Sequence, residues 1–362
     1  MLKKGRSTLF LPKGSNPAST KLQRFWLGEL RGAANGQKGL PSMRYNEVAS
    51  QITSLSNNER LDFIARAARL KAAVDALTAE EVLEHLDYSG LIPECFGHGS
   101  SDEKLYAKYC DALLARALRE LGLKARSILE GTDAAPVSAN GDDYSIVGDA
   151  KAFRLSRPPM HQKDFSVEAI NKCRKGATFA FLVCPLYQYP SKPNQIYELA
   201  VKFNVTLLSY THIGFMTKRG PEPRPSLRDV WKEIIDRGSI QGELQRRKRR
   251  PPEGSWRVGK SLKGMRDPNS YWRAFDRAML AWAGANQAMW EEAKQAAAAR
   301  LPLQAEEQIQ FYERERPRIE KLPDAVVGKE LVVASEIDQK IQAIRETVSK
   351  VRSRIDKSRS SS

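Results

Sequence analysis

The strongest constraint on the fold of this chain is an alternation of apolar strands and helices between residues 144 and 210. The segments 144–153, 178–184 and 205–210 have the β-branched, aromatic and aliphatic residues typical of strands. The segments 166–174 and 191–203, which separate them, have the composition of helices. Strands that alternate with helices predict an α/β fold with a mixed central sheet flanked by helices.

The first strand carries a pair of charged residues that can do chemistry. Side chains on a strand alternate between its faces, so Asp149 and Lys151 project side by side. A second acid, Asp133, lies sixteen residues upstream, across an expected hairpin connection. Two carboxylates form a hard oxygen site that suits Mg²⁺, and a lysine beside them can orient a water and stabilise negative charge. This pattern is typical of the PD-(D/E)xK nucleases, although an isolated Asp-x-Lys is more often a salt-bridged strand.

The residues that flank this strand narrow the assignment. Four segments carry the match: GDAKAFRLSR (148–157), QKDF (162–165), SSDEKL (100–105) and PLYQYP (185–190). Together they resemble the HindIII family of type II restriction endonucleases, over about residues 45–215 and weakly beyond. The resemblance implies a restriction-endonuclease-like core, here with helical N- and C-terminal regions added. It also implies Mg²⁺-dependent cleavage of double-stranded DNA at a palindromic, AAGCTT-like site, leaving 5′-phosphate ends. A homodimer and a cognate DNA methyltransferase are the expected partners.

The resemblance also assigns roles to residues. Asp133 and Asp149 are expected to bind the metal together with the backbone of Ala150, and Lys151 is expected to assist the attacking water. Glu103, on the helix before the catalytic strands, is expected to complete the metal site, although Ser100 and Glu103 equally suit a helix capping box.

Three further acids are considered as members of the site. Because Thr132 and not proline precedes Asp133, Asp142 or Asp143 remain alternatives for the first acid. We expect Asp111, on the same helix flank as Glu103, to be a solvated charge.

Two groups of residues are expected to contact DNA. Arg154, Arg157, Gln162 and Lys163 follow the catalytic strand closely, so they should lie within reach of the DNA. By residue type, the first three suit base edges and Lys163 suits a phosphate. The second group is the basic run Arg246, Arg247, Lys248, Arg249 and Arg250. An ordinary polar loop and a solvated linker are the alternative interpretations.

The distribution of charge favours an anionic polymer as partner. The net charge is +16, and the segments 1–45 and 245–266 each hold nine basic residues and one acid. Those two segments therefore account for the whole excess, which indicates nucleic acid or two solubilising segments. No apolar run is long enough for a membrane span, and the four cysteines form no zinc-binding pattern. We expect a cytoplasmic protein with reduced thiols.

The chain divides by composition into four regions. We expect a basic, disordered extension (1–45), the nuclease core (46–215), a basic linker and DNA-contact segment (216–268) and a helical C-terminal region (269–362). Apolar residues between 333 and 355 recur at three- and four-residue steps, which suits packing on another helix, including one across a dimer. Two other functions remain open: a non-catalytic DNA-binding protein, and a repair or nicking nuclease of the same fold.

Overall fold

The computed structural model describes residues 43–129, 135–159, 161–232, 267–320 and 334–360. The chain divides into two compact units, Met1–Ser42 and Met43–Ser362. The first unit lies outside the described residues, and the second contains every element described.

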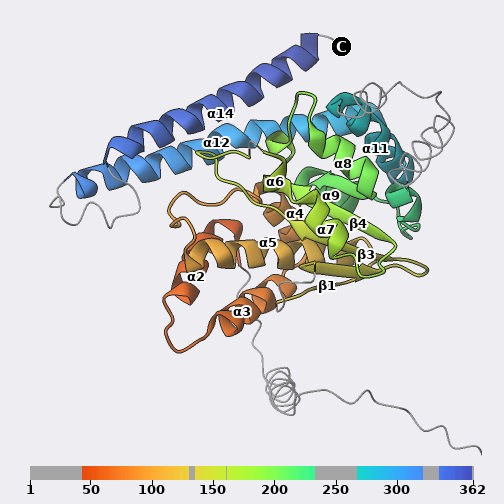
Figure 1. Cartoon of the computed structure of the whole chain (residues 1–362), viewed down its shortest axis with the longest axis horizontal. Coiled ribbons are helices and arrows are strands. Elements are labelled where there is room, and N and C mark those ends of the chain that lie inside the picture. Colours follow the sequence, from red (N-terminus) through yellow and green to blue (C-terminus); the bar gives the residue numbers. More distant parts are fainter. Residues whose placement is uncertain (1–42, 130–134, 160, 233–266, 321–333, 361–362) are drawn as a thin grey trace, which may run out of the picture. The chain divides into compact units, whose positions relative to one another are not determined.

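A mixed sheet of five strands, in the order β1-β2-β3-β4-β5, lies at the centre of the second unit (Figure 1). Its strands are β1 (Lys124–Ser127), β2 (Val137–Asn140), β3 (Ser145–Ala150), β4 (Phe179–Cys184) and β5 (Val205–Ser209). The first three strands pair antiparallel, and β4 and β5 continue parallel to β3. The mixed α/β fold predicted from the strand–helix alternation is thereby confirmed, whereas β1 and β2 were not predicted.

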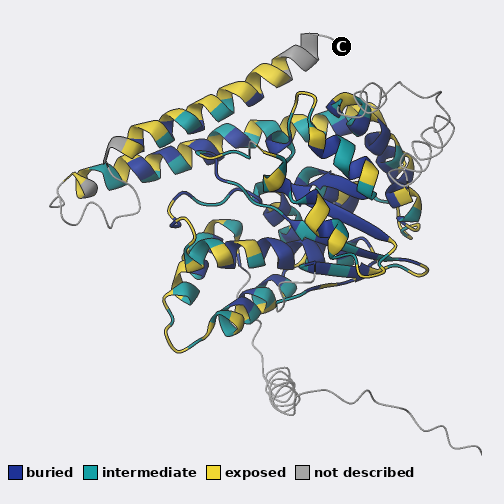
Figure 2. Cartoon of the chain, in the orientation of Figure 1, coloured by how far each residue is buried: buried dark blue, intermediate teal, exposed yellow. Residues whose placement is uncertain are grey.

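Helices cover both faces of the sheet. On one face lie η1 (Tyr45–Glu47), α2 (Val48–Ser56), α3 (Phe63–Asp75), α4 (Ala79–Tyr88), α5 (Ser101–Glu120) and α9 (Tyr210–Arg219). On the other lie α6 (Gln162–Phe165), α7 (Val167–Lys172) and α8 (Gln195–Phe203), with η2 (Leu186–Gln188) following β4. Because both faces are covered, β4 is buried along its whole length (Figure 2).

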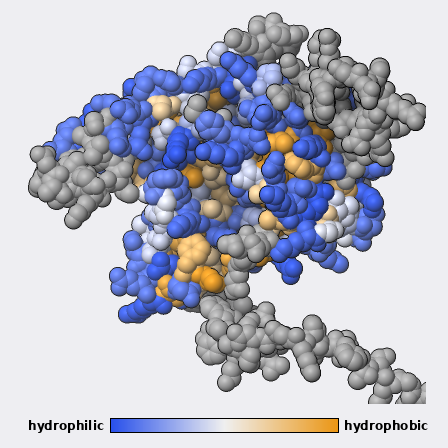
Figure 3. All heavy atoms as spheres, viewed as in Figure 1, coloured by the Kyte–Doolittle hydropathy of each residue, from blue (hydrophilic) through white to orange (hydrophobic). Residues whose placement is uncertain are grey.

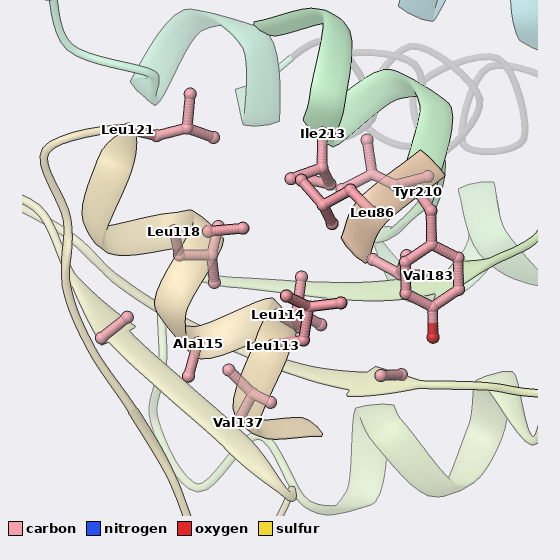
Figure 4. Close-up of a cluster of buried hydrophobic side chains, with 14 of the residues drawn as sticks. Leu86, Leu113, Leu114, Ala115, Leu118, Leu121, Val137, Val183, Tyr210 and Ile213 are labelled. Carbon is pink, nitrogen blue, oxygen red and sulfur yellow. The ribbon is translucent and has the colours of Figure 1, made fainter. Parts of the chain in front are cut away.

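The helix α5 is the centre of the larger core. Its N-cap Ser100 accepts a hydrogen bond from the backbone of Glu103, and its apolar residues face the sheet. Figure 4 shows Leu113, Leu114 and Leu118 of α5 gathered with Val137 and Val183. This packing fixes α5 against the strands, including β3, which bears Asp149.

The C-terminal region is helical, as predicted, but folds back on itself. It consists of α11 (Pro268–Ala283), α12 (Gln287–Ile319) and α14 (Ala334–Ser360). The helices α11 and α12 are separate because Gly284 adopts a left-handed conformation, with φ 58°, that ends α11.

The apolar residues of the last helix pack against another helix of the same chain. Ile337, Ile341, Ile344 and Val351 of α14 are buried against residues of α12, so α12 and α14 form a helical hairpin (Figure 1). On the face shown in Figure 3, the side chains over this hairpin are mostly hydrophilic. Among the described residues, the buried part of the apolar stripe predicted for the tail is therefore covered by α12. No described helix combines the length and apolar character needed to cross a membrane.

Candidate active site

The strand β3 delivers a carboxylate and an ammonium to one place. The Nζ of Lys151 lies 2.6 Å from Oδ2 of Asp149, and their side chains are 25% and 15% exposed. The backbone of Lys151 is anchored on both sides: its N–H donates to the carbonyl of Val183 at 2.7 Å, and the hydroxyl of Tyr210 donates to its carbonyl at 3.2 Å. Buried and partly exposed residues alternate along β3, as predicted, so the charged pair faces away from the main core.

A third charged group meets this pair from α5. Asp111 is buried, and the backbone N–H of Ala150 donates a hydrogen bond to its carboxyl group. Burial, and after it the neighbouring charge of Asp149, together raise the pKa of Asp111 to about 8, against the opposing effect of Lys108. The Nζ of Lys108 lies 3.8 Å from Oδ2 of Asp111. The carboxyl groups of Asp111 and Asp149 thus lie close enough, where β3 ends, for the charge of one to affect the other.

This donor set fits a divalent cation. Two neighbouring carboxylates, one of them buried and raised in pKa by the other, lose their mutual repulsion when a cation binds between them. Carboxylate oxygens are the ligands that Mg²⁺ prefers. Within the described ranges, no cluster of three or more acidic, histidine or cysteine side chains is arranged to hold a metal ion. Asp133 belongs to residues 130–134, which lie outside those ranges.

Comparison with known proteins decides the family. The family model described as HindIII restriction endonuclease matches residues 46–236 and 240–348. The chain belongs to the HindIII restriction endonuclease family. Over 172 residues it is 34% identical to the type II restriction enzyme HindIII of Haemophilus influenzae. The aligned stretch covers 47% of this chain and 56% of that enzyme. The chain therefore spans about half the length of this curated relative. The family match continues well past residue 215, further than the sequence motifs indicated.

The structure discriminates among the acids considered for the first metal position of this HindIII-family chain. Asp142 and Asp143 lie in the turn that opens β3, so six or seven residues, roughly 20 Å of strand, separate them from Asp149. The residues that flank the segment of Asp133 lie at the opposite end. The N–H of Ile128 donates to the carbonyl of Pro136 at 2.7 Å, and Val137 pairs with Gly148, next to Asp149. This placement disfavours Asp142 and Asp143, and the role of Asp133 stays a prediction.

Glu103 does not join Asp149 and Lys151. It precedes Asp111 by eight residues, about 12 Å along the helix axis. Its carboxylate instead accepts from the backbone of Gly99 and lies 3.3 Å from the guanidinium of Arg154. The metal role expected of Glu103 stays a prediction, and the acid of α5 that lies near Asp149 is Asp111.

Arg154 is buried, which does not fit the base contact expected of it. Its guanidinium donates to the carbonyl of Pro93 at 3.1 Å and pairs with Glu103 and, at 3.8 Å, with Glu94. The carboxylate of Glu94 is fully buried and also accepts from Ser156 and from the hydroxyl of Tyr312, both at 2.8 Å. Arg154 is therefore committed to a polar network that joins the segment after β3 to α12.

The other predicted DNA contacts are accessible but dispersed. Arg157 is exposed, with its guanidinium 3.4 Å from the ring of His98. Lys163 is exposed and Gln162 half-buried on α6, which Phe165 anchors in the smaller core. The run 246–250 lies outside the described residues.

Sequence reasoning missed Asp111, which was expected to be a solvated charge and is buried. The signal was present, since Asp111 stands between Tyr109-Cys110 and Ala112-Leu113-Leu114, an unusual place for an unpaired acid. An acid embedded in an apolar run of a helix that precedes a catalytic strand is therefore worth considering as a metal ligand in such chains.

Proposed function

We propose that this chain is a Mg²⁺-dependent type II restriction endonuclease that cleaves duplex DNA at a short palindromic site. The observation that carries the proposal is the pair of Asp149 and Lys151 at the end of β3, backed by Asp111, in a chain of the HindIII family. The curated relative is named a type II restriction enzyme. From the same resemblance we propose an AAGCTT-like site and 5′-phosphate ends.

The residues divide the chemistry between them. Asp149, Asp111 and Asp133 would hold Mg²⁺, together with the backbone of Ala150. When bound, the ion lowers the pKa of a coordinated water and neutralises charge on the phosphate. Lys151, held against Asp149, orients the attacking water and stabilises the negative charge that develops on the phosphate.

The proposed partners follow from the substrate. A self-symmetric site calls for a two-fold homodimer, in which each subunit cuts one strand. Because the apolar stripe of α14 is covered by α12, the dimer contact would use another surface. A cognate methyltransferase that protects the host's sites completes the proposed system, and the cytoplasm is the compartment where both would act.

A plasmid digest tests the activity. With Mg²⁺ the protein should produce discrete fragments that can be ligated, whose ends give the site and the cut position, and with EDTA it should produce none. Nicked circles would indicate a nicking or repair nuclease, and retarded but intact plasmid would indicate a non-catalytic DNA-binding protein.

Substitutions test the assignment of residues. Asp149→Ala, Lys151→Ala and Asp133→Asn should each abolish cleavage while the protein still folds and binds DNA. Asp143→Asn is the matched control, since Asp143 pairs with Arg228 at the other end of β3 and should not affect cleavage. Normal cleavage by the Asp149 or Lys151 variant would overturn the assignment of the active site.

A further inference from the structure

The helix α5 leads to the candidate active site along an exposed stripe. In its first half Ser101, Lys104 and Ala107 are exposed and Lys108 is partly exposed. From Tyr109 to Ala115 every residue is buried, including Asp111. The accessible surface of the helix therefore ends where Asp111 meets β3.

Two lysines and no free carboxylate occupy this stripe. Positions 104, 108 and 111 are spaced i, i+4 and i+7 and share one side of the helix. Lys108 is 24% exposed, with its ammonium 3.8 Å from Asp111, and Lys104 makes no ion pair within the described part of the chain.

The acids of the first turn face elsewhere. The carboxylate of Glu103 is bound to Gly99 and Arg154, and one carboxylate oxygen of Asp102 is buried. The stripe is thus a cationic surface that ends at the acidic pair of Asp111 and Asp149.

We propose that Lys104 and Lys108 bind the phosphate backbone of the DNA strand that is cut, beside the scissile phosphate. This inference rests on the proposed function. Neither lysine was expected to contact DNA from the sequence motifs, and neither belongs to the catalytic pattern. Their role is to fix the strand along α5, which places the scissile phosphate at Asp149 and Lys151.

The spacing gives the phosphates that each lysine should contact. Along the helix axis Lys108 lies about 4.5 Å from Asp111 and Lys104 about 10 Å, at 1.5 Å per residue. Lys108 is therefore assigned to the phosphate next to the cut, and Lys104 to a phosphate farther along the same strand.

The first experiment measures the salt dependence of binding. Lys104→Gln and Lys108→Gln are compared with the unchanged protein on a duplex bearing the site mapped by the digest, in Ca²⁺ to prevent cutting. Each variant loses one phosphate contact, so the slope of log K against log salt concentration should shrink by about 0.9. If a variant and the unchanged protein bind equally at 1 M salt, the variant should bind about eightfold more weakly at 0.1 M salt.

Lys294→Gln is the matched control. Lys294 also pairs with an acid three residues away on a helix, Glu291, and is 30% exposed. It lies on α12, where its loss should leave the slope unchanged.

The second experiment locates the contacts with duplexes in which one phosphate at a time is replaced by a neutral methylphosphonate. Neutralising the phosphate one step from the cut should weaken binding of the unchanged protein but not of the Lys108 variant. A phosphate farther from the cut on the same strand should show the same pattern with the Lys104 variant. If the loss of affinity from the lysine substitution and the loss from the neutralised phosphate simply add at every position, the assignment is overturned.

The outcomes separate the two proposals. If the unchanged protein cuts the plasmid but both lysine variants keep its salt slope, the stripe does not bind the backbone and the proposed function stands. If the unchanged protein neither binds nor cuts duplex DNA, both proposals are overturned.

Discussion

Replacing Asp111 with asparagine should stabilise the protein while abolishing its activity. Asparagine keeps an oxygen that accepts the hydrogen bond from the backbone of Ala150, but it carries no charge to desolvate. The ordinary pKa of the group is 3.8, and burial with the nearby charge of Asp149 raises it to about 8 in the folded protein. The folded state therefore holds a proton that the unfolded state releases.

The sign and size of the effect follow from this difference. Between about pH 4 and pH 8 unfolding releases a proton, so the free energy of unfolding of the unchanged protein falls as the pH rises through this window. The asparagine variant lacks this loss. At pH 7 the gain amounts to about 4 kcal/mol, at 1.36 kcal/mol per pKa unit, and it should vanish near pH 4.

Urea unfolding in EDTA, followed by tryptophan fluorescence at pH 4, 7 and 8, measures this gain. Mg²⁺ should narrow the difference, because it would stabilise only the protein that binds it. Asp338→Asn is the control, because Arg316 lowers the pKa of Asp338 and its replacement should bring no gain. A variant of Asp111 that is no more stable than the unchanged protein at pH 8 would refute the reasoning.

Three other perturbations separate structural from DNA-binding roles. Arg154→Ala should cost about 3–5 kcal/mol of stability, because it leaves the carboxylate of Glu94 buried without its cation. If urea unfolding instead shows unchanged stability and the variant no longer prefers its site, Arg154 contacts a base as first expected. Tyr312→Phe removes one donor to the same carboxylate and should cost about 1–3 kcal/mol, seen as a lower thermal midpoint. Replacing the basic residues of 246–250 with glutamine should weaken binding to specific and random DNA by similar factors and flatten the salt dependence, as an equilibrium titration at several salt concentrations would show.

The sequence predicted those parts of the fold whose cause is local. The alternation along β3 put Ile146 and Ala150 on one face and Asp149 on the other, because side chains alternate between the two faces of a strand. The caps at Thr78 and Ser100 were recognisable because their side chains bond to backbone groups only three residues away. The strands β1 and β2 were missed because KARS and VSAN are short and largely lack the residues that favour strands.

Only the part of the site formed by residues close together in the sequence could be predicted. Asp149 lies on β3 and Lys151 directly after its end, two positions apart, so the alternation of side chains along an extended chain brings them together. Whether an acid of α5 reaches them depends on how the helix packs on the sheet, and in this packing Asp111 lies near Asp149 while Glu103 pairs with Arg154. The burial of Arg154 depends on Glu94 and, through it, on Tyr312, which lies 218 residues from Glu94 in the chain.

The contacts that the C-terminal hairpin makes with the segment after β3 have a consequence for synthesis. The hydroxyl of Thr347 donates to the carbonyl of Leu155, 192 residues earlier, and Tyr312 of α12 holds Glu94 beside Ser156. A ribosome adding about 5–20 residues per second needs roughly 10–40 s to make that stretch. The segment next to Lys151 therefore gains these supports only after α12 and α14 have been made. A chain that lacks α12 and α14 lacks these contacts, so the segment next to Lys151 is not held in this way until both helices have been made.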